Sequence, residues 1–202
     1  MVDYSIENEY REKGFNIICG VDEAGRGPLA GPVYAAAVIL PSDCVIEGLN
    51  DSKKLTEKKR EALFDEIKEK ALAYGIASAD EKEIDEINIL NATFLAMKRA
   101  IDLLSVRPDL ALIDGNQKPH TDIEEVTVIK GDAKSMSIAA ASVLAKVSRD
   151  RFMLEMAEKY PQYEFARHKG YGTKLHYEKI AQYGVCDIHR RTFLKKILGE
   201  QK

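Results

Sequence analysis

Two apolar runs of strand length constrain the fold of this chain most strongly. Residues 15–21 (FNIICGV) and 33–40 (VYAAAVIL) carry no charged side chain, and a segment rich in glycine and proline separates them. Uncharged runs of this length are typical of strands that are buried on both faces of a sheet. Both are far shorter than the roughly 20 apolar residues that cross a bilayer. We therefore expect two neighbouring core strands and no membrane span.

The rest of the chain alternates between helical and strand patterns. Apolar residues at helical spacing predict helices at 56–72 and 90–104, and a long third helix at 135–160 that Pro161 closes. Short apolar or alternating runs predict further strands at 74–79, 110–113 and 125–129. This order indicates an α/β fold with a mixed five-stranded sheet flanked by helices. Residues from about 161 to 202 follow as a basic, aromatic loop and a small helical lobe.

Composition fits one globular domain over residues 1–202, because 45% of the residues are hydrophobic and can form a packed core. The three cysteines form no CxxC pair, which favours a reducing compartment over a disulfide framework. The amino terminus is acidic, so we expect a cytoplasmic protein without a leader. No His/Cys spacing supports a zinc site, and we interpret three histidines as surface or phosphate-contacting residues: His168, His176 and His189.

The net charge of −3 hides an uneven distribution along the chain. Residues 1–128 carry 15 Lys and Arg against 25 Asp and Glu, whereas residues 129–202 carry 15 against 8. A basic carboxyl-terminal third could follow a polyanion such as nucleic acid. A chance split over solvated helix surfaces explains the numbers equally well.

Acidic residues stand at the ends of three predicted strands. Asp22 and Glu23 follow the first strand, Asp114 follows the fourth and Asp132 lies just past the fifth. A single aspartate in such a place is more often a turn former or a helix cap. Several carboxylates brought together need compensating cations, and oxygen ligands suit Mg²⁺ or Mn²⁺. Two such ions could activate a water molecule and stabilise the departing oxygen of a phosphodiester.

The adjacent pair Asp22 and Glu23 presents a geometric difficulty, because successive residues of a flat strand point to opposite faces. Either the chain bends at this point or Glu23 contributes through its backbone carbonyl. The glycines just downstream are compatible with a bend.

Three weaker patterns are compatible with nucleic-acid binding. Gly25-Arg26-Gly27 is a short loop whose backbone can approach a ligand closely and whose guanidinium can hold a phosphate, although a plain turn is the more common explanation. Lys53 precedes a predicted helix and could contact a phosphate, which a solvated helix start explains nearly as well. Tyr171 lies between two glycines in the basic loop and could present its ring to a sugar or base. The alternative for Tyr171 is a buried ring that anchors the loop.

Taken in order, the longer segments resemble ribonuclease HII, the type 2 ribonuclease H. They are residues 21–33 (VDEAGRGPLAGPV), 51–55 (DSKKL), 113–116 (IDGN), 130–132 (KGD), 138–150 (IAAASVLAKVSRD) and 168–173 (HKGYGT). The match spans roughly residues 16–195, and several segments of this length are far more specific than one short motif.

The resemblance implies a ribonuclease H-like fold and hydrolysis of the RNA strand of RNA/DNA hybrids. It also implies cleavage on the 5′ side of a single ribonucleotide in duplex DNA, which leaves 3′-hydroxyl and 5′-phosphate ends. By position in the motifs, the catalytic ligands of two Mg²⁺ or Mn²⁺ ions would be Asp22, Glu23, Asp114 and Asp132. Gly25, Arg26 and Gly27 would read the 2′-hydroxyl, Tyr171 would stack on the adjoining deoxynucleotide sugar, and Lys53 would contact a phosphate.

Two other functions stay open at this point. A nuclease or integrase-like phosphotransferase of the same fold would cut without a 2′-hydroxyl. A non-catalytic hybrid-binding module would bind without Mg²⁺, although four acidic residues in the motifs argue against it. We expect a monomer that acts on RNA/DNA hybrids and on ribonucleotide-containing duplex DNA. A sliding-clamp partner is doubtful, because the tail ends soon after the segment 189–193 (HRRTF).

Overall fold

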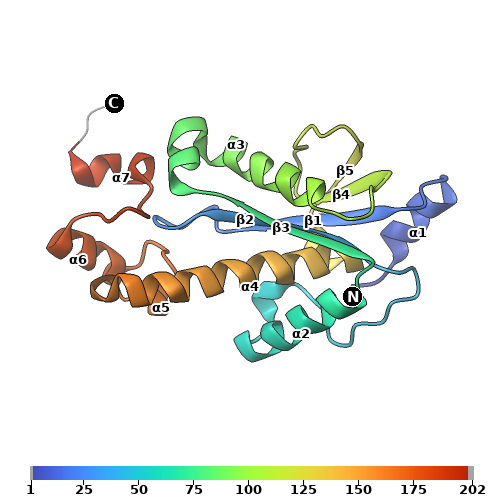
Figure 1. Cartoon of the computed structure of the whole chain (residues 1–202), viewed down its shortest axis with the longest axis horizontal. Coiled ribbons are helices and arrows are strands. Elements are labelled where there is room, and N and C mark those ends of the chain that lie inside the picture. Colours follow the sequence, from blue (N-terminus) through green and yellow to red (C-terminus); the bar gives the residue numbers. More distant parts are fainter. Residues whose placement is uncertain (1, 200–202) are drawn as a thin grey trace.

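A five-stranded mixed sheet forms the centre of the computed structural model, which describes residues 2–199 (Figure 1). Its strands are β1 (Ile18–Ala24), β2 (Val33–Ile39), β3 (Ala73–Ala79), β4 (Leu110–Asp114) and β5 (Glu124–Val128), in the order β3-β2-β1-β4-β5. β2 pairs antiparallel with both β1 and β3, whereas β4 pairs parallel with both β1 and β5. The expected mixed five-stranded sheet is therefore confirmed.

Helices cover both faces of the sheet (Figure 1). The helix α3 (Glu81–Asp102) lies on one face, and α2 (Glu57–Lys70) and the long α4 (Met136–Lys159) lie on the other. One apolar core forms between the sheet and α3 and includes Val21 and Met97. A second core forms between the sheet and the pair α2 and α4, and it includes Val38 and Leu144. Both faces of β1 and β2 are buried in this way, as the uncharged runs predicted.

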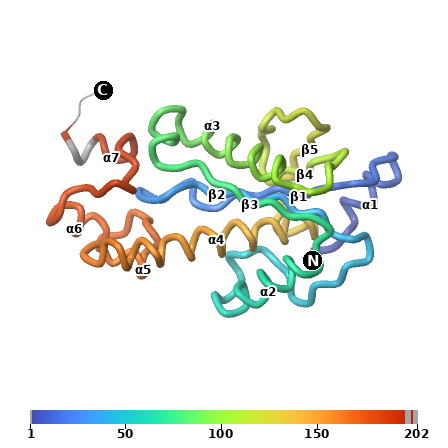
Figure 2. The backbone as a smooth tube through the Cα atoms, in the orientation of Figure 1, coloured from blue at the N-terminus to red at the C-terminus, as the bar shows by residue number. Residues whose placement is uncertain are grey.

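A helical lobe follows α4 at the end of the molecule opposite to α1 (Ser5–Glu12) (Figure 2). It consists of the 3₁₀ turn η3 (Pro161–Tyr163) and the helices α5 (Phe165–His168), α6 (Lys174–Tyr183) and α7 (Arg191–Leu198). The rings of Tyr163 and Phe165 stack with centroids 5.3 Å apart and pack against Met153 of α4. The expected lobe is present, and residues 200–202 of it lie outside the described range.

The first strand runs further than its sequence pattern predicted. The antiparallel ladder between β1 and β2 continues through Asp22 and Glu23 to the pair Ala24 and Tyr34. The two acidic residues therefore lie within the strand and not after it, because main-chain pairing continues where the apolar pattern stops.

The helix expected at residues 90–104 begins at Glu81, inside the acidic stretch. Asp80 accepts hydrogen bonds from the main-chain N–H groups of Lys82 and Glu83, and the Glu83 carboxylate accepts one from the N–H of Asp80. This capping box, together with the favourable effect of acidic residues on a helix N-terminus, explains the earlier start. A positive φ of 67° at Asn88 separates the two helical parts of α3.

The first turn of α4 crosses β1 at Gly20, where two main chains are in close contact. A β-carbon at this position would lie 2.1 Å from the carbonyl carbon of Ser137, so the crossing requires glycine. Glu7 of α1 also holds this turn, because its buried carboxylate accepts hydrogen bonds from the hydroxyl groups of Ser135 and Ser137 at 2.7 and 2.5 Å. The position of α4 on the sheet is thus fixed at its beginning.

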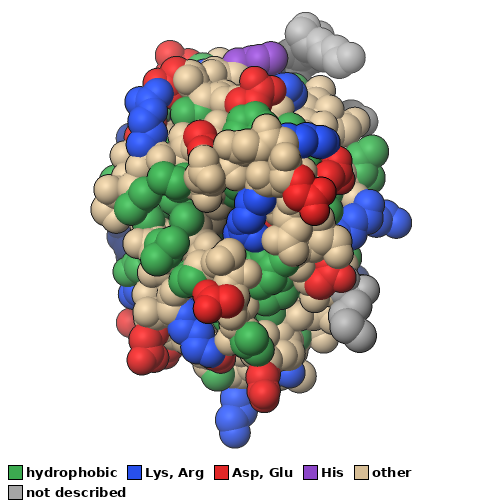
Figure 3. Space-filling model, turned by 90° about the vertical axis from the view of Figure 1, so that its right-hand side faces the viewer, with side chains coloured by type: hydrophobic (Ala, Val, Ile, Leu, Met, Phe, Trp, Pro, Cys, Tyr) green, Lys and Arg blue, Asp and Glu red, His purple; other side chains and the backbone are tan. Residues whose placement is uncertain are grey.

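Acidic and basic side chains intermingle on the end of the molecule that Figure 3 shows, where α1 lies. That end presents no extended patch of one charge among the residues drawn in colour. In the part of the chain that the structure describes, no helix is long and apolar enough to cross a membrane.

Candidate metal centre and substrate-binding loops

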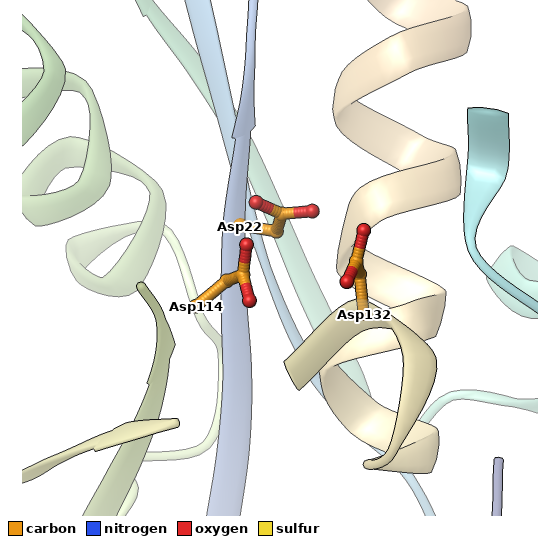
Figure 4. A group of neighbouring side chains, drawn as sticks. All are labelled: Asp22, Asp114 and Asp132. Carbon is orange, nitrogen blue, oxygen red and sulfur yellow. The ribbon is translucent and has the colours of Figure 1, made fainter. Parts of the chain in front are cut away.

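Three aspartates from separate parts of the chain converge beside the sheet (Figure 4). Asp22 lies on β1, Asp114 ends β4 and Asp132 lies in the 3₁₀ turn η2 (Gly131–Ala133). One carboxylate oxygen of each residue lies within 4.8 Å of those of the others. Because β1 and β4 are parallel neighbours with Val21 opposite Ile113, the aspartate that follows in each strand lies beside the other. The structure thus brings together three of the residues that the motifs singled out.

The connection after β5 places the third aspartate. Lys130 adopts a φ of 57°, and the N–H of Gly131 then donates a 2.6 Å hydrogen bond to Oδ1 of Asp114. A β-carbon on Gly131 would lie 2.5 Å from Cδ1 of Ile138 and 3.2 Å from that same oxygen, so glycine keeps η2 close to β4. The side chain of Asp132 is thereby held next to Asp114 (Figure 4).

Burial and mutual repulsion act on these carboxylates. Asp22 is 5% exposed, and burial raises its pKa well above the usual value, with further contributions from the charges of Glu23 and Asp114. Burial and the charge of Asp114 likewise raise the pKa of Asp132. The Nζ of Lys53 lies 3.8 Å from Oδ2 of Asp132, but its side chain is 80% exposed and its charge is screened by solvent. Carboxylate oxygens in this number and spacing fit a hard divalent cation such as Mg²⁺ or Mn²⁺.

Glu23 does not belong to the cluster of three aspartates. It pairs with Ala35 of β2 within the continuous ladder of β1, so its side chain points to the face opposite to that of Asp22. There its Oε1 lies 3.6 Å from a guanidinium nitrogen of Arg26, and it lines a small cavity together with Asp114. The Glu23 side chain therefore lies on the other side of the strand from the cluster of three aspartates and near Asp114.

The loop Gly25-Arg26-Gly27, called the glycine loop below, lies next to Tyr171, although Gly27 and Tyr171 are 144 positions apart in the sequence. A β-carbon on Gly27 would lie 3.9 Å from Cε1 of Tyr171. Tyr171 is 43% exposed. Its ring lies over the guanidinium of Arg149, whose Cζ is 5.7 Å from the ring centroid. Tyr171 is therefore not the buried anchor that the sequence left open. Its ring and the loop form one partly exposed surface.

The three histidines of the lobe are buried, and the expectation that they lie at the surface is wrong. His168, His176 and His189 are 6%, 0% and 2% exposed. The N–H of Cys186 donates to Nδ1 of His189, so Nε2 of His189 carries the hydrogen and donates to Nε2 of His176. Nδ1 of His176 then donates to the carbonyl oxygen of Tyr171 at 3.0 Å. Neutral imidazoles with these partners tolerate burial, and they hold the backbone of Tyr171.

This buried pair predicts a loss of stability in mild acid. Burial lowers the pKa of both His176 and His189 to about 4, so between pH 6.5 and 4 the unfolded chain binds protons that the folded chain does not. The free energy of unfolding therefore falls as the pH falls, by about 2 kcal/mol per histidine between pH 7 and 5. Urea unfolding of a His189→Asn variant, which keeps an acceptor for Cys186, is expected to show a correspondingly shallower pH dependence.

The matched control for this experiment is His120→Asn. His120 is exposed and has a φ of 58°, a conformation that asparagine tolerates. We expect the control to keep the wild-type pH dependence. An equal change of slope in both variants would show that the buried pair is not responsible.

Comparison with solved structures defines the class of protein. The chain is similar to the ribonuclease H2 of Pyrococcus horikoshii, with a TM-score of 0.76, 28% identity and coverage of 92% of this chain and 97% of that one. It is similar to the RNase HII of Archaeoglobus fulgidus, solved as a complex with PCNA, with a TM-score of 0.66, 26% identity and coverage of 87% and 94%. Bst-RNase HIII, solved with Mn²⁺, shares the fold, with a TM-score of 0.64, 18% identity and coverage of 83% and 63%. The fold and the acidic cluster define a metal-dependent nuclease of the ribonuclease H class.

Comparison with known sequences gives the family. The ribonuclease HII family model matches residues 19–196. The chain is 58% identical to the ribonuclease HII of Caldicellulosiruptor bescii over 97% of this chain and 95% of that protein, and 60% identical to that of Acetivibrio thermocellus over 95% and 75%. The chain belongs to the ribonuclease HII family. It cleaves RNA/DNA hybrids and duplex DNA with an embedded ribonucleotide, which decides against both alternatives considered from the sequence.

Proposed function

We propose that Asp22, Glu23, Asp114 and Asp132 hold two divalent cations, Mg²⁺ or Mn²⁺, and form the catalytic centre. The observation that carries this proposal is the convergence of three aspartates within 4.8 Å. The Mn²⁺ in the solved Bst-RNase HIII supports an ion of this kind. Asp22 would be shared, with Glu23 and Asp114 on one ion and Asp132 on the other. When bound, the ions supply an activated water molecule and stabilise the departing oxygen of the phosphodiester.

The substrate contacts would come from the surface beside this centre. The backbone of Gly25, Arg26 and Gly27 would read the 2′-hydroxyl at the junction, which is the group that distinguishes RNA from DNA. Tyr171 would stack on the sugar of the adjoining deoxynucleotide. The proximity of Gly27 to the partly exposed Tyr171 supports this arrangement. Lys53, close to Asp132 and largely exposed, would contact a backbone phosphate.

Cleavage of an end-labelled duplex that carries one ribonucleotide tests this function most directly. We expect a single cut on the 5′ side of the ribonucleotide, with 3′-hydroxyl and 5′-phosphate ends. The same duplex without the ribonucleotide should stay intact. A cut on the 3′ side, or equal cleavage of the all-DNA duplex, would contradict the assignment of the glycine loop.

Addition of Mn²⁺ is expected to stabilise the folded protein, because a cation that binds only the folded state shifts the unfolding equilibrium. At 100 times its Kd, the ion contributes about 2.7 kcal/mol, or roughly 5–10 °C in the melting temperature of a chain of this size. Asp132→Asn should remove more than half of this shift, whereas Asp65→Asn, an exposed residue of α2, should leave it unchanged. Equal shifts in the wild type and Asp132→Asn would place the ion elsewhere.

We further propose that the chain acts as a monomer in the cytoplasm on its nucleic-acid substrate. Residues 1–202 would form a single catalytic domain, to which the lobe contributes Tyr171. The packing of Tyr163 and Phe165 against α4 supports one unit. The Archaeoglobus fulgidus relative is solved with PCNA, but a sliding clamp is not part of this proposal.

A further inference from the structure

Two buried arginines lie beneath the loop that connects β1 to β2. Arg149 of α4 is 1% exposed and Arg190, just before α7, is 0% exposed. Their hydrogen-bond partners are main-chain carbonyl groups and not carboxylates. A buried charge is unfavourable unless its donors are satisfied, so seven well-defined partners indicate a specific structural task.

Arg190 directs four of its five guanidinium N–H donors at one loop. Nε donates to the carbonyl oxygen of Gly31 at 2.8 Å, and the terminal nitrogens donate to the carbonyl oxygens of Gly25, Arg26 and Pro28 at 2.5, 2.9 and 2.8 Å. Only arginine offers this many donors in a rigid plane without an acceptor. The segment is therefore held from the inside by its carbonyl groups.

The neighbouring contacts extend the same pattern. The main-chain N–H of Arg190 donates to the carbonyl oxygen of Leu29 at 2.9 Å. The Arg149 guanidinium donates to the carbonyl oxygens of Ala30 and Pro32 at 3.1 and 3.2 Å, and to that of Lys169 in the loop that carries Tyr171. Within residues 25–32, every carbonyl except that of Gly27 accepts a hydrogen bond from one of these two arginines.

This arrangement decides which way the amide hydrogens of the loop point. In a trans peptide the carbonyl of one residue is antiparallel to the N–H of the next. Since the carbonyls of Gly25 and Arg26 point inward to Arg190, the N–H groups of Arg26 and Gly27 point outward. Both residues are exposed, and within the described chain no acceptor takes either N–H. Two donors without an acceptor among the described residues therefore point away from Arg190, in a loop whose Gly27 lies near Tyr171.

We propose that Arg190 is a positioning residue for ribonucleotide recognition, because it holds the carbonyls of Gly25 and Arg26 so that the N–H groups of Arg26 and Gly27 face the 2′-hydroxyl. This inference rests on the proposed function of the glycine loop. Arg190 itself does not touch the substrate. Its loss would change which duplex is preferred, and the acidic cluster would be unaffected.

Duplex binding by the full chain in an Asp22→Asn background, which prevents cleavage, tests this proposal. Fluorescence anisotropy in Mn²⁺ would compare two duplexes that differ only in one 2′-hydroxyl. Arg190→Lys is expected to lower the preference for the ribonucleotide duplex by about tenfold, as the loss of two hydrogen bonds implies. The Kd for the all-DNA duplex should stay within about twofold, and Arg191→Lys, an exposed neighbour, should leave both Kd values unchanged.

Different outcomes would contradict the positioning role of Arg190 and the proposed function of the glycine loop. An Arg190→Lys protein that keeps the preference, or that loses affinity for both duplexes equally, overturns the positioning role. A parent protein without any preference refutes the proposed reading of the 2′-hydroxyl by the loop.

A measurement without substitution at position 190 covers the case in which Arg190→Lys does not fold. Amide hydrogen exchange in the Asp22→Asn protein should show fast exchange at Arg26 and Gly27 and protection by the ribonucleotide duplex alone. Slow exchange at these amides in the free protein would also overturn the inference.

Discussion

Replacement of Asp22 by asparagine is expected to lower kcat for a ribonucleotide-containing duplex by a factor on the order of 10³ or more. Asp22 is buried and is the member of the acidic cluster that lies on β1, and its carboxylate is the one that we assign to both cations. Loss of a shared ligand removes several kcal/mol of charge stabilisation in the transition state. A loss of about 4 kcal/mol corresponds to a decrease in kcat of three orders of magnitude. Steady-state cleavage in Mg²⁺ and in Mn²⁺ measures the effect.

The same substitution should not destabilise the metal-free protein. Because burial and the neighbouring charges raise the pKa of Asp22, its ionised form opposes folding at neutral pH, and an amide of the same shape removes that charge. Urea unfolding in chelator should therefore give an equal or higher free energy of unfolding. Asp65→Asn serves as the exposed control and should keep wild-type activity. A folded Asp22→Asn protein that still cuts at the wild-type rate would remove Asp22 from the catalytic centre.

Replacement of Gly20 by alanine is expected to have the largest effect on stability. The new β-carbon would lie 2.1 Å from the carbonyl carbon of Ser137 and 2.2 Å from the nitrogen of Ile138, and main-chain atoms in a helical turn cannot rotate away as a flexible side chain can. Overpacking of a core typically costs 1–3 kcal/mol, and a clash with the main chain places this variant at or above about 3 kcal/mol. Movement of α4 away from β1 would also disturb the approach of Asp132 to Asp22, so activity should fall as well.

Thermal and urea unfolding measure the loss. Gly27→Ala is the matched control, because its added β-carbon meets only a ring atom of Tyr171 at 3.9 Å and its backbone is not in the left-handed region. The control should unfold like the wild type, whatever its effect on substrate preference. A Gly20→Ala protein as stable as the wild type would mean that the crossing of α4 and β1 is looser than the structure shows.

The sequence predicted the elements of the fold because burial leaves a periodic pattern of apolar residues. The uncharged run at 33–40 became β2, and the stripe that includes Met97 and Ile101 became the second part of α3. The pattern failed at the active end of β1. Asp22 and Glu23 are polar and interrupted the apolar run, although the main-chain ladder continued past them. When the last residues of a strand are polar functional residues, the apolar run in the sequence is shorter than the strand.

The residues that support the proposed substrate-binding loops were not predictable in the same way. Arginine usually lies at the surface and histidine is intermediate, and both Arg190 and His176 can be fully buried because main-chain groups satisfy them. The sequence does not indicate which main-chain carbonyl accepts a hydrogen bond, because every residue has a carbonyl group. The carboxylate cluster was easier to anticipate, because several carboxylates at the ends of neighbouring strands need compensating cations, whereas a single aspartate there is usually a turn former or a helix cap.

The helix α4 connects the proposed metal centre to the loop that we propose to read the ribonucleotide. Ser142 of α4 lies beside Asp22, and Arg149 of the same helix lies beneath the glycine loop. Seven residues are almost two helical turns, so both side chains leave the same side of the helix about 10 Å apart. The helix α4 therefore fixes the separation of these two places. From this fixed separation we expect a cut at a constant offset from the ribonucleotide, whatever the surrounding base sequence.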